Sequence, residues 1–366
     1  MERPWYSRFN WLLAATTVAL ALFGDVVIHS ATLHNPDAAS EWRKQLVYIA
    51  IGVVVMAWCA WVDYRRWQRW AIYLYSINLG LLYLVWKSGH SAMGAQRWIS
   101  LGPIGTFQPS EPAKLVLAIV IASLLARTMI VGFKEMFYTL VAVALPAFLI
   151  LKQPDLGTTL VIFGILTAQL FFGVSRTGYF AAYAALVAVA GAFVVGTNAV
   201  LKPFQRSRIL IFLHPNSDPQ GAGWSLSQSK IAVGSGELFG KGLTHGTQTQ
   251  LDFVPEHSRD FIFSVVGEEL GYVGAIALIC AYAIILFGAV GAVFASRDRF
   301  ALLLSVGIVA LLAFHVVVNI GMTVGIMPIT GIPLPFMSYG GSAIITDFAA
   351  IGILLNVHMQ RDRLVF

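Results

Sequence analysis

The sequence predicts an all-α polytopic membrane protein with about ten transmembrane helices, folded as one integral membrane domain over residues 1–366. Of the 366 residues, 58% are hydrophobic and 11% are charged, whereas a soluble domain carries about 25% charged residues. The mean hydropathy is +0.75. So few charged residues cannot cover a water-exposed surface. The net charge of +6 indicates contact with anionic membrane lipids, and no basic patch outside the loops predicts nucleic-acid binding.

Ten apolar stretches are candidates for the spans, since a helix needs about 20 mostly apolar residues to cross a bilayer. The second, third and fifth stretches are short, and the eighth is long enough to tilt or bend. An even number of spans places both chain termini on the same side. The ten stretches cover residues 10–28, 45–62, 70–86, 111–130, 136–151, 156–174, 178–197, 261–294, 300–324 and 340–357.

Lysine and arginine in the short loops predict the orientation, because cytoplasmic loops carry an excess of these residues. Twelve lie on the side of the termini and six on the other side, leaving aside the long loop at 198–260. We therefore expect cytoplasmic termini and an extracytoplasmic loop between the seventh and eighth spans. The twelve are Arg3, Arg8, Arg65, Arg66, Arg69, Arg127, Lys134, Arg176, Arg297, Arg299, Arg361 and Arg363, and the six are Arg43, Lys44, Lys87, Arg97, Lys114 and Lys152.

Two segments between the spans have a different pattern. Residues 88–110 are punctuated by glycine and proline and predict a short amphipathic piece in the outer leaflet. Residues 325–341 are apolar but contain three prolines and four glycines, so they cannot form a regular helix. Irregular backbone at membrane depth requires protein or a wet cavity to satisfy its polar groups. We expect a re-entrant turn there that lines a cavity.

Acidic residues gather where the long loop enters the eighth span. An ionisable group at that boundary costs several kcal/mol if it enters hydrocarbon, so the pattern favours a functional site. Asp260 lies where polarity stops, and partial desolvation would raise its pKa toward that of a general base, although a nearby cation opposes the shift. The alternative role for Asp260 is a helix cap, for which Asn would substitute well. The five acids are Asp252, Glu256, Asp260, Glu268 and Glu269.

Other charged residues near span ends are candidates for substrate binding. Glu111 and Lys114 are spaced i, i+3 and share one helix face. They either grip a diphosphate or form a pair that holds the helix end at the headgroups. Asp155 precedes the sixth span, where an acid suits the helix dipole, so capping is its favoured role. No cluster of cysteine and histidine predicts a zinc site, and Asp25, His315 and Asp347 inside the spans are assigned to packing or pairing.

The long loop has the capacity to bind anions. Its glycine-rich stretch VGSGELFGKGLTHGTQ (233–248) and its cations resemble a phosphate cradle only weakly, because no strand–helix context of a Walker motif surrounds them. The cations of the loop are Lys202, Arg206, Arg208, Lys230, Lys241 and Arg259.

Five motifs, in this order and spacing, resemble the SEDS family (shape, elongation, division and sporulation), the RodA, FtsW and SpoVE proteins of bacterial cell-wall synthesis. The form TGIPLPFMSYGG is most similar to the elongation members. The chain departs from the family at 258–260, where SRD replaces the more usual HTD; the acid is kept and Arg259 changes the local charge. The motifs are GAQRWISLGPIGTFQPSEPAKL (94–115), KQPDLGTT (152–159), QSKIAVGSGELFGKG (228–242), FVPEHSRDFIFSVVGEELG (253–271) and GIPLPFMSYGGS (331–342).

The resemblance implies a GT-C-like peptidoglycan glycosyltransferase that polymerises lipid II on the outer face of the cytoplasmic membrane, with a class B penicillin-binding protein, a transpeptidase, as partner. It assigns the essential aspartate to Asp260 and the charged couple of the fourth span to Glu111 and Lys114. We expect the substrate to contact further residues of the motifs and of the loop. These are Arg97, Gln108, Asp155, Arg206, Lys230, Lys241, Glu256 and Ser338.

The expected reaction is a single inverting displacement, in which the 4-hydroxyl of the acceptor GlcNAc attacks C1 of the donor MurNAc. Asp260 is the expected base, and cations stabilise the departing diphosphate. The sequence leaves open whether a divalent cation, Mg or Mn, shares that task, and no other cofactor is expected. The alternative of another class is a lipid II flippase, which predicts charge midway through the membrane with access to both faces. A non-catalytic scaffold would leave the acids at the rim unexplained.

Overall fold

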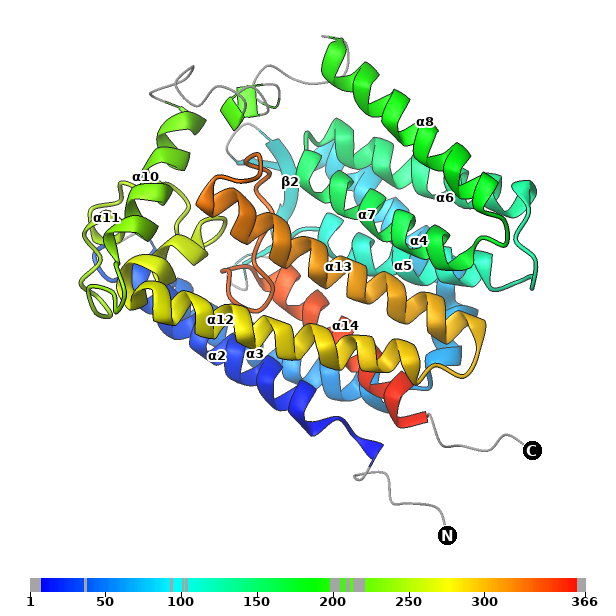
Figure 1. Ribbon diagram of the computed structural model, residues 1–366, viewed down its shortest axis with the longest axis horizontal. Coiled ribbons are helices and arrows are strands. Elements are labelled where there is room, and N and C mark those ends of the chain that lie inside the picture. Colours follow the sequence, from blue (N-terminus) through cyan, green and yellow to red (C-terminus); the bar gives the residue numbers. More distant parts are fainter. Residues whose placement is uncertain are drawn as a thin grey trace.

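The computed structural model describes residues 8–35, 38–92, 95–100, 102, 105–197, 205, 207–208, 211–212 and 221–360. Within these residues, each of the ten predicted spans corresponds to one long helix of a bundle (Figure 1). The helices are α2 (Trp11–Thr32), α3 (Glu41–Trp61), α4 (Tyr64–Ser88), α5 (Ser110–Leu125), α6 (Phe133–Lys152), α7 (Leu156–Gly173), α8 (Thr177–Gly196), α12 (Ile262–Phe294), α13 (Arg299–Val324) and α14 (Gly341–Met359).

In the described part of the chain, seven of these helices are long and apolar enough to cross a membrane: α2, α3, α6, α7, α12, α13 and α14. The three others are α4, α5 and α8, of which α8 counts only as a shorter apolar helix over Thr177–Ala192. Helix α4 begins with the basic run Tyr64–Arg69, which lowers its hydropathy. The 16 residues of α5 extend over only about 24 Å, and most of them are buried inside the protein. The chain is a multi-pass membrane protein, as predicted.

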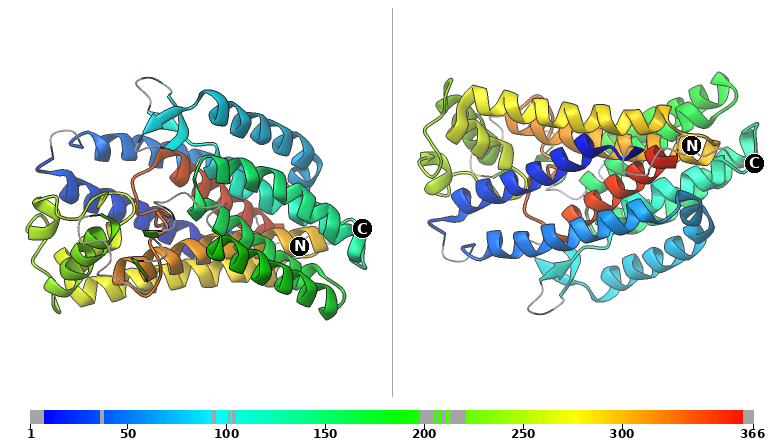
Figure 2. Two further views of the ribbon diagram at one scale, coloured as in Figure 1. Left: turned by 90° about the horizontal axis from the view of Figure 1, so that it is seen from above. Right: turned by 90° about the horizontal axis from the view of Figure 1, so that it is seen from below.

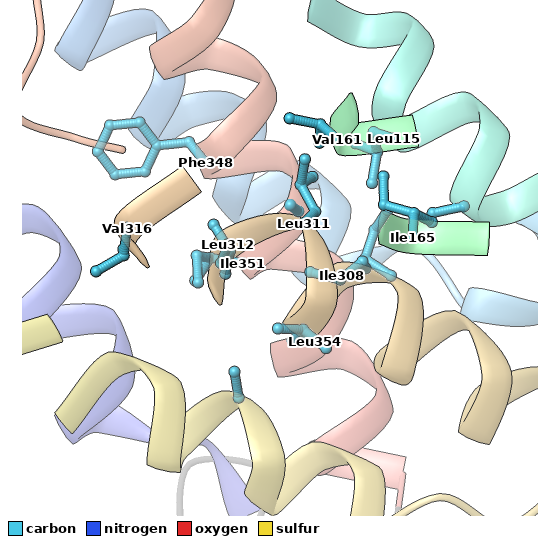
Figure 3. Packing of buried hydrophobic residues seen from close by; sticks show 14 of the residues in the cluster. Leu115, Val161, Ile165, Ile308, Leu311, Leu312, Val316, Phe348, Ile351 and Leu354 are labelled. Carbon is cyan, nitrogen blue, oxygen red and sulfur yellow. The ribbon is translucent and has the colours of Figure 1, made fainter. Parts of the chain in front are cut away.

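The core of the bundle lies around α13, which packs against α5, α7, α12 and α14. Leu115, Val161, Ile308 and Phe348 come from four different helices and belong to one buried hydrophobic cluster (Figure 3). Branched and aromatic side chains that interdigitate in this way fix the helices relative to one another through dispersion contacts. The core therefore holds in place the ends of α5, α7, α13 and α14 on which the candidate site is built.

Helix α12 is interrupted at Gly271, whose φ of 66° and ψ of −163° are not helical. A Cβ atom there would lie 2.3 Å from the backbone nitrogen of Gly240, so only glycine fits. The loop at 236–242 supplies partners for the backbone groups that the break exposes: Tyr272 N–H donates to the Glu237 carbonyl, and Lys241 N–H donates to the Glu268 carbonyl. The bend predicted for the eighth span is therefore at Gly271.

Residues 90–107 form a small sheet and not a continuation of the helical pattern. Strand β2 (Ala95–Ser100) pairs antiparallel with β1 (His90–Ala92) on one side and with β3 (Thr106–Phe107) on the other. The all-α prediction holds for the bundle, and these three short strands are its exception. Gly89 ends helix α4 in an extended conformation, and Gly102 and Gly105, between β2 and β3, have positive φ angles that favour glycine.

Residues 325–340 have no regular helix and are largely buried, which confirms the predicted irregular segment. Gly331 and Phe336 have positive φ angles of 69° and 65°. Helix α2 passes so close that a Cβ on Gly24 would lie 2.8 Å from the Phe336 carbonyl oxygen. We call residues 325–340 the re-entrant segment.

The start of α2 and the end of α14 lie at one end of the bundle (Figure 2). The opposite end carries α10 (Ala222–Ser235), α11 (Thr247–Gln250) and the turns that connect them to α12. The described part of the long loop therefore lies at the end of the bundle remote from these two helix termini, as expected for a loop that follows the seventh of ten spans.

Candidate active site

Asp260 lies two residues before α12, and the backbone around it is held by the rest of the protein. Three consecutive carbonyl groups each accept a hydrogen bond from a distant element. The Ser258 carbonyl accepts from the Tyr339 N–H at 2.9 Å, the Arg259 carbonyl from the Ser338 hydroxyl at 2.5 Å, and the Asp260 carbonyl from the Asn319 amide at 2.8 Å. The re-entrant segment and α13 thus fix the position of Asp260.

The Asp260 carboxylate lies against Gly331 of the re-entrant segment. A Cβ at Gly331 would be 3.1 Å from Asp260 Oδ2 and 3.4 Å from Arg208 Nη1, so both charged groups face this glycine. Its positive φ also favours glycine. Because Gly331 has no side chain, the Asp260 carboxylate and the Arg208 guanidinium can both lie close to its backbone.

Burial is the main cause of a raised pKa at Asp260, which lies at about 6, and the charge of Glu256 adds to the effect. Arg208, Arg259 and Arg97 act in the opposite direction and lower the pKa. A carboxyl group with a pKa near 6 is deprotonated at neutral pH and is a stronger base than an ordinary aspartate. The predicted direction of the shift and its opposition by cations are both confirmed.

Two arginines from different parts of the chain face Asp260. Arg97 is held on β2, where its guanidinium donates to the carbonyls of Gln153 and Pro154 and lies 3.9 Å from Asp155 Oδ1. Arg208 belongs to the long loop, and it interacts electrostatically with Asp260, Arg97 and Asp155. The site therefore has one base beside two cations, with Asp155 as the counter-charge.

Asp155 caps α7: its Oδ1 accepts from the Thr158 N–H at 3.1 Å and its Oδ2 from the Thr158 hydroxyl at 3.0 Å. The favoured capping role is confirmed. Gln108 lies next to it and donates to Ser110 Oγ at 3.0 Å and to Asp155 Oδ2 at 3.4 Å. Asp155 also pairs with Arg97, so the cap and the cation are held together.

Glu111 and Lys114 are inside the protein and not at its rim. Lys114 is 2% exposed, and its Nζ contacts Glu111 Oε2 at 2.8 Å and His315 Nε2 at 3.1 Å. Asp347 interacts with both charges of the pair. The assignment of His315 to pairing is confirmed. The headgroup anchor considered for the Glu111–Lys114 pair is wrong, because α5 is enclosed by α4, α7, α13 and α14.

The other predicted cations differ in their surroundings. Lys241 Nζ pairs with the buried Glu268 Oε1 at 2.8 Å, and Glu268 also accepts from the backbone N–H groups of Gln248 and Thr249. Lys241 thus holds the loop onto α12. Lys230 of α10 is exposed and lies against Gly325, at the end of α13. Arg206 lies outside the described residues.

A family model described as "Cell cycle protein", that of FtsW, RodA and SpoVE, matches residues 10–363. The chain belongs to this family. It is 38% identical to the peptidoglycan glycosyltransferase MrdB of Escherichia coli (strain K12), over 95% of this chain and 92% of that protein.

Two solved structures share the fold of this family member. A chain in a study of structural coordination of polymerization and crosslinking by a peptidoglycan synthase complex is 30% identical, with a TM-score of 0.83, and the match covers 97% of this chain and 99% of that one. The rod shape determining protein RodA of Thermus thermophilus is 28% identical with a TM-score of 0.72, over 97% and 98% of the two chains.

Sequence reasoning missed two residues of the site in this family member. Arg208 is one of six cations of the long loop, and the sequence contains no signal that distinguishes it from Arg206. Asn319 lies in the middle of an apolar span, and a buried amide in such a helix signals a backbone partner. Among the described residues no group of three or more histidines, cysteines, aspartates or glutamates is placed to hold a metal ion.

Proposed function

We propose that this protein is a peptidoglycan glycosyltransferase that polymerises lipid II into glycan strands during cell elongation, with Asp260 as the catalytic base. Membership of the family and the 38% identity to a peptidoglycan glycosyltransferase support the activity. The elongation role is supported by the similarity to a rod shape determining protein. The observation that carries the site is the Asp260 carboxyl, with a pKa of about 6, beside Arg97 and Arg208.

The geometry supports a single inverting displacement. Asp260 removes the proton of the acceptor GlcNAc 4-hydroxyl as its oxygen attacks C1 of the donor MurNAc, and the C1–O bond to the undecaprenyl diphosphate breaks with its electrons going to the leaving oxygen. Arg97 and Arg208 stabilise the diphosphate, because one guanidinium group can donate two parallel hydrogen bonds to two phosphate oxygens. One base and a stabilised leaving group are sufficient for inversion.

The other residues predicted to contact the substrate differ in how close they lie to Asp260 and in whether they already have an ion-pair partner. Glu256, Gln108 and Ser338 lie beside the Asp260 loop or the Arg97–Asp155 pair, and we propose that they orient substrate and catalytic groups. The exposed Lys230, and Arg206 in the same loop, remain proposed contacts for the diphosphate. Lys114, Glu111 and Lys241 already have ion-pair partners, so their support for substrate binding is weaker than that of Arg208.

We further propose that the Asp260 end of the bundle faces outward from the bacterial cytoplasmic membrane and that both termini are cytoplasmic. The excess of Lys and Arg on the terminal side supports this orientation. A class B penicillin-binding protein is the proposed partner, supported by the 0.83 TM-score to a chain of a peptidoglycan synthase complex.

The test is polymerisation of lipid II by the purified full-length protein in liposomes, with and without a class B penicillin-binding protein whose transpeptidase serine is inactivated. We expect a ladder of glycan strands with the wild type and its loss with Asp260→Asn, by a factor of about 10² or more. Asp252→Asn is the matched control, since Asp252 lies in the same loop and is mostly exposed.

Two results would contradict the proposal. A ladder of normal intensity from Asp260→Asn would remove Asp260 as the base. A folded wild type that yields no ladder with any partner, yet moves labelled lipid II between leaflets, would identify a transporter.

A further inference from the structure

We propose that Glu41, at the start of α3, is a positioning residue for Asp260: its carboxylate holds Ser258 and Arg259, the two residues that precede Asp260, and neutralises the charge of Arg259. The proposal rests on the proposed function of Asp260. Glu41 is far from Asp260 in the sequence, and none of the five motifs contains it.

Both oxygens of Glu41 are used. Oε1 accepts from Arg259 Nη2 at 3.2 Å, and Oε2 accepts from the Ser258 hydroxyl at 2.9 Å. The Glu41 side chain is only 13% exposed. A carboxylate on one helix that accepts hydrogen bonds from two adjacent loop residues restrains the backbone of that loop more strongly than a single hydrogen bond would. Helix α3 is thereby joined to the loop that carries Asp260.

Arg259 lies between two carboxylates and a ring. Its Nη1 is 3.2 Å from Glu256 Oε2, opposite the Glu41 contact at Nη2, and its guanidinium carbon is 5.5 Å from the centre of the Tyr339 ring. The planar guanidinium matches this arrangement, which a lysine would not. The positive charge next to Asp260 is therefore balanced by two carboxylates, Glu41 of α3 and Glu256 of the Asp260 loop.

The balance matters because Asp260 is surrounded by charges from several elements. Glu256 and Arg259 face it from its own segment, Arg208 from the long loop and Arg97 from β2. All three arginines stabilise the carboxylate and so weaken it as a base. Glu41 acts on Asp260 through Arg259, and loss of its charge would leave Arg259 with Glu256 as its remaining carboxylate partner.

The experiment measures turnover against pH in the lipid II assay for wild type, Glu41→Gln, Arg259→Gln and the double variant. Glu41→Gln should lower the plateau about threefold to tenfold and move the acidic midpoint down by about half a pH unit, because Asp260 becomes more acidic. Arg259→Gln should move the midpoint up. In the Arg259→Gln background, Glu41→Gln should lower the rate by a clearly smaller factor than in the wild-type background, since the contact with the Ser258 hydroxyl is the only one left to lose.

Glu237→Gln is the matched control, because Glu237 is an exposed carboxylate at the same end of the bundle. It should leave both the plateau and the midpoint unchanged, and thermal melting of every variant checks folding. Wild-type rates and midpoint in Glu41→Gln would overturn the inference, as would an equal loss in both Arg259 backgrounds. A wild type without polymerase activity would instead contradict the proposed function.

Discussion

Asn319 joins Asp260 to Ile332: the two N–H bonds of its side-chain amide reach the backbone carbonyls of both residues, at 2.8 Å and 2.7 Å. Asn319 belongs to α13, Asp260 to the loop before α12, and Ile332 to the re-entrant segment. One buried amide therefore fixes the distance between the loop that carries Asp260 and the segment against which the Asp260 carboxylate lies.

Replacing Asn319 by leucine should lower kcat by a large factor while the protein still folds, with a lower thermal midpoint. The change leaves two buried carbonyls without donors, at a cost of about 1–3 kcal/mol each, and releases Asp260 from Gly331. We expect a fall in kcat of about tenfold or more, because small displacements of a catalytic group are costly. Turnover of lipid II and the thermal midpoint of unfolding are measured on the same preparation.

Asn356→Leu is the control for this prediction. Asn356 also bridges two backbone groups, accepting from the Tyr64 N–H at 2.9 Å and donating to the Ala60 carbonyl at 2.7 Å, but it lies at the other end of the bundle. A similar loss of stability with normal kcat is expected. An equal loss of kcat in both variants would mean that Asn319 acts only on folding.

Turnover should rise with pH and level off above about pH 7, because Asp260 works in its ionised form and its pKa is about 6. Roughly a tenth of such a group is ionised at pH 5 and nine-tenths at pH 7. Arg208→Gln should move the acidic midpoint upward, since Arg208 stabilises the carboxylate. A pH-independent rate between pH 5 and 7, with substrate binding unchanged, would show that the Asp260 ionisation does not limit the reaction.

Gly331→Ala should inactivate the enzyme with a modest loss of stability. The new Cβ would lie 3.1 Å from Asp260 Oδ2, and an alanine at positive φ costs about 1–2 kcal/mol. Gly242→Ala has the same kind of backbone cost, with φ of 94°, but its Cβ comes no closer than 3.7 Å to another group. We expect a loss of kcat of at least about tenfold in Gly331→Ala only; comparable rates in the two variants would contradict the close contact.

The Glu111–Lys114 pair should respond to single and double substitution in opposite ways if it is structural. Lys114→Met leaves the buried Glu111 charge unpaired, at a cost of about 3–5 kcal/mol. The double variant Glu111→Leu, Lys114→Met should regain most of the stability and the polymerase activity. Thermal melting and the lipid II assay distinguish the two roles. A double variant that is folded but inactive would support the role in which the pair contacts the diphosphate.

The ten helices were predictable because each coincides with a long, mostly apolar stretch of the sequence, and seven of them are long and apolar enough to cross a membrane. The location of the α12 break was not, because Gly271 is one of several glycines near that span and its partner loop is 30 residues earlier in the chain. The pairing of β2 with β1 and with β3 was not predicted, because each strand is short and the register of each pair depends on the turn that connects its strands.

Asp260 could be found from the sequence because polarity ends abruptly at that residue. Arg208, Asn319 and Glu41 could not, since each acts through a contact with a residue far away in the chain. The position of Lys114 was also not predictable. Its place near the end of a span indicated the membrane surface, whereas the neighbouring helices enclose it. Sequence patterns identify groups at boundaries, and only the packing shows which groups meet.

The break at Gly271 divides α12 into two mechanical units. The outer turns, Ile262–Leu270, are bonded to the loop at 236–249 through Glu268 and through the backbone groups freed by the break. The inner turns are packed with the other spans. Gly271 therefore separates a short helical segment, whose direction is set by the loop at 236–249, from a long segment whose direction is set by the neighbouring helices, so the two parts of α12 are oriented by different parts of the chain.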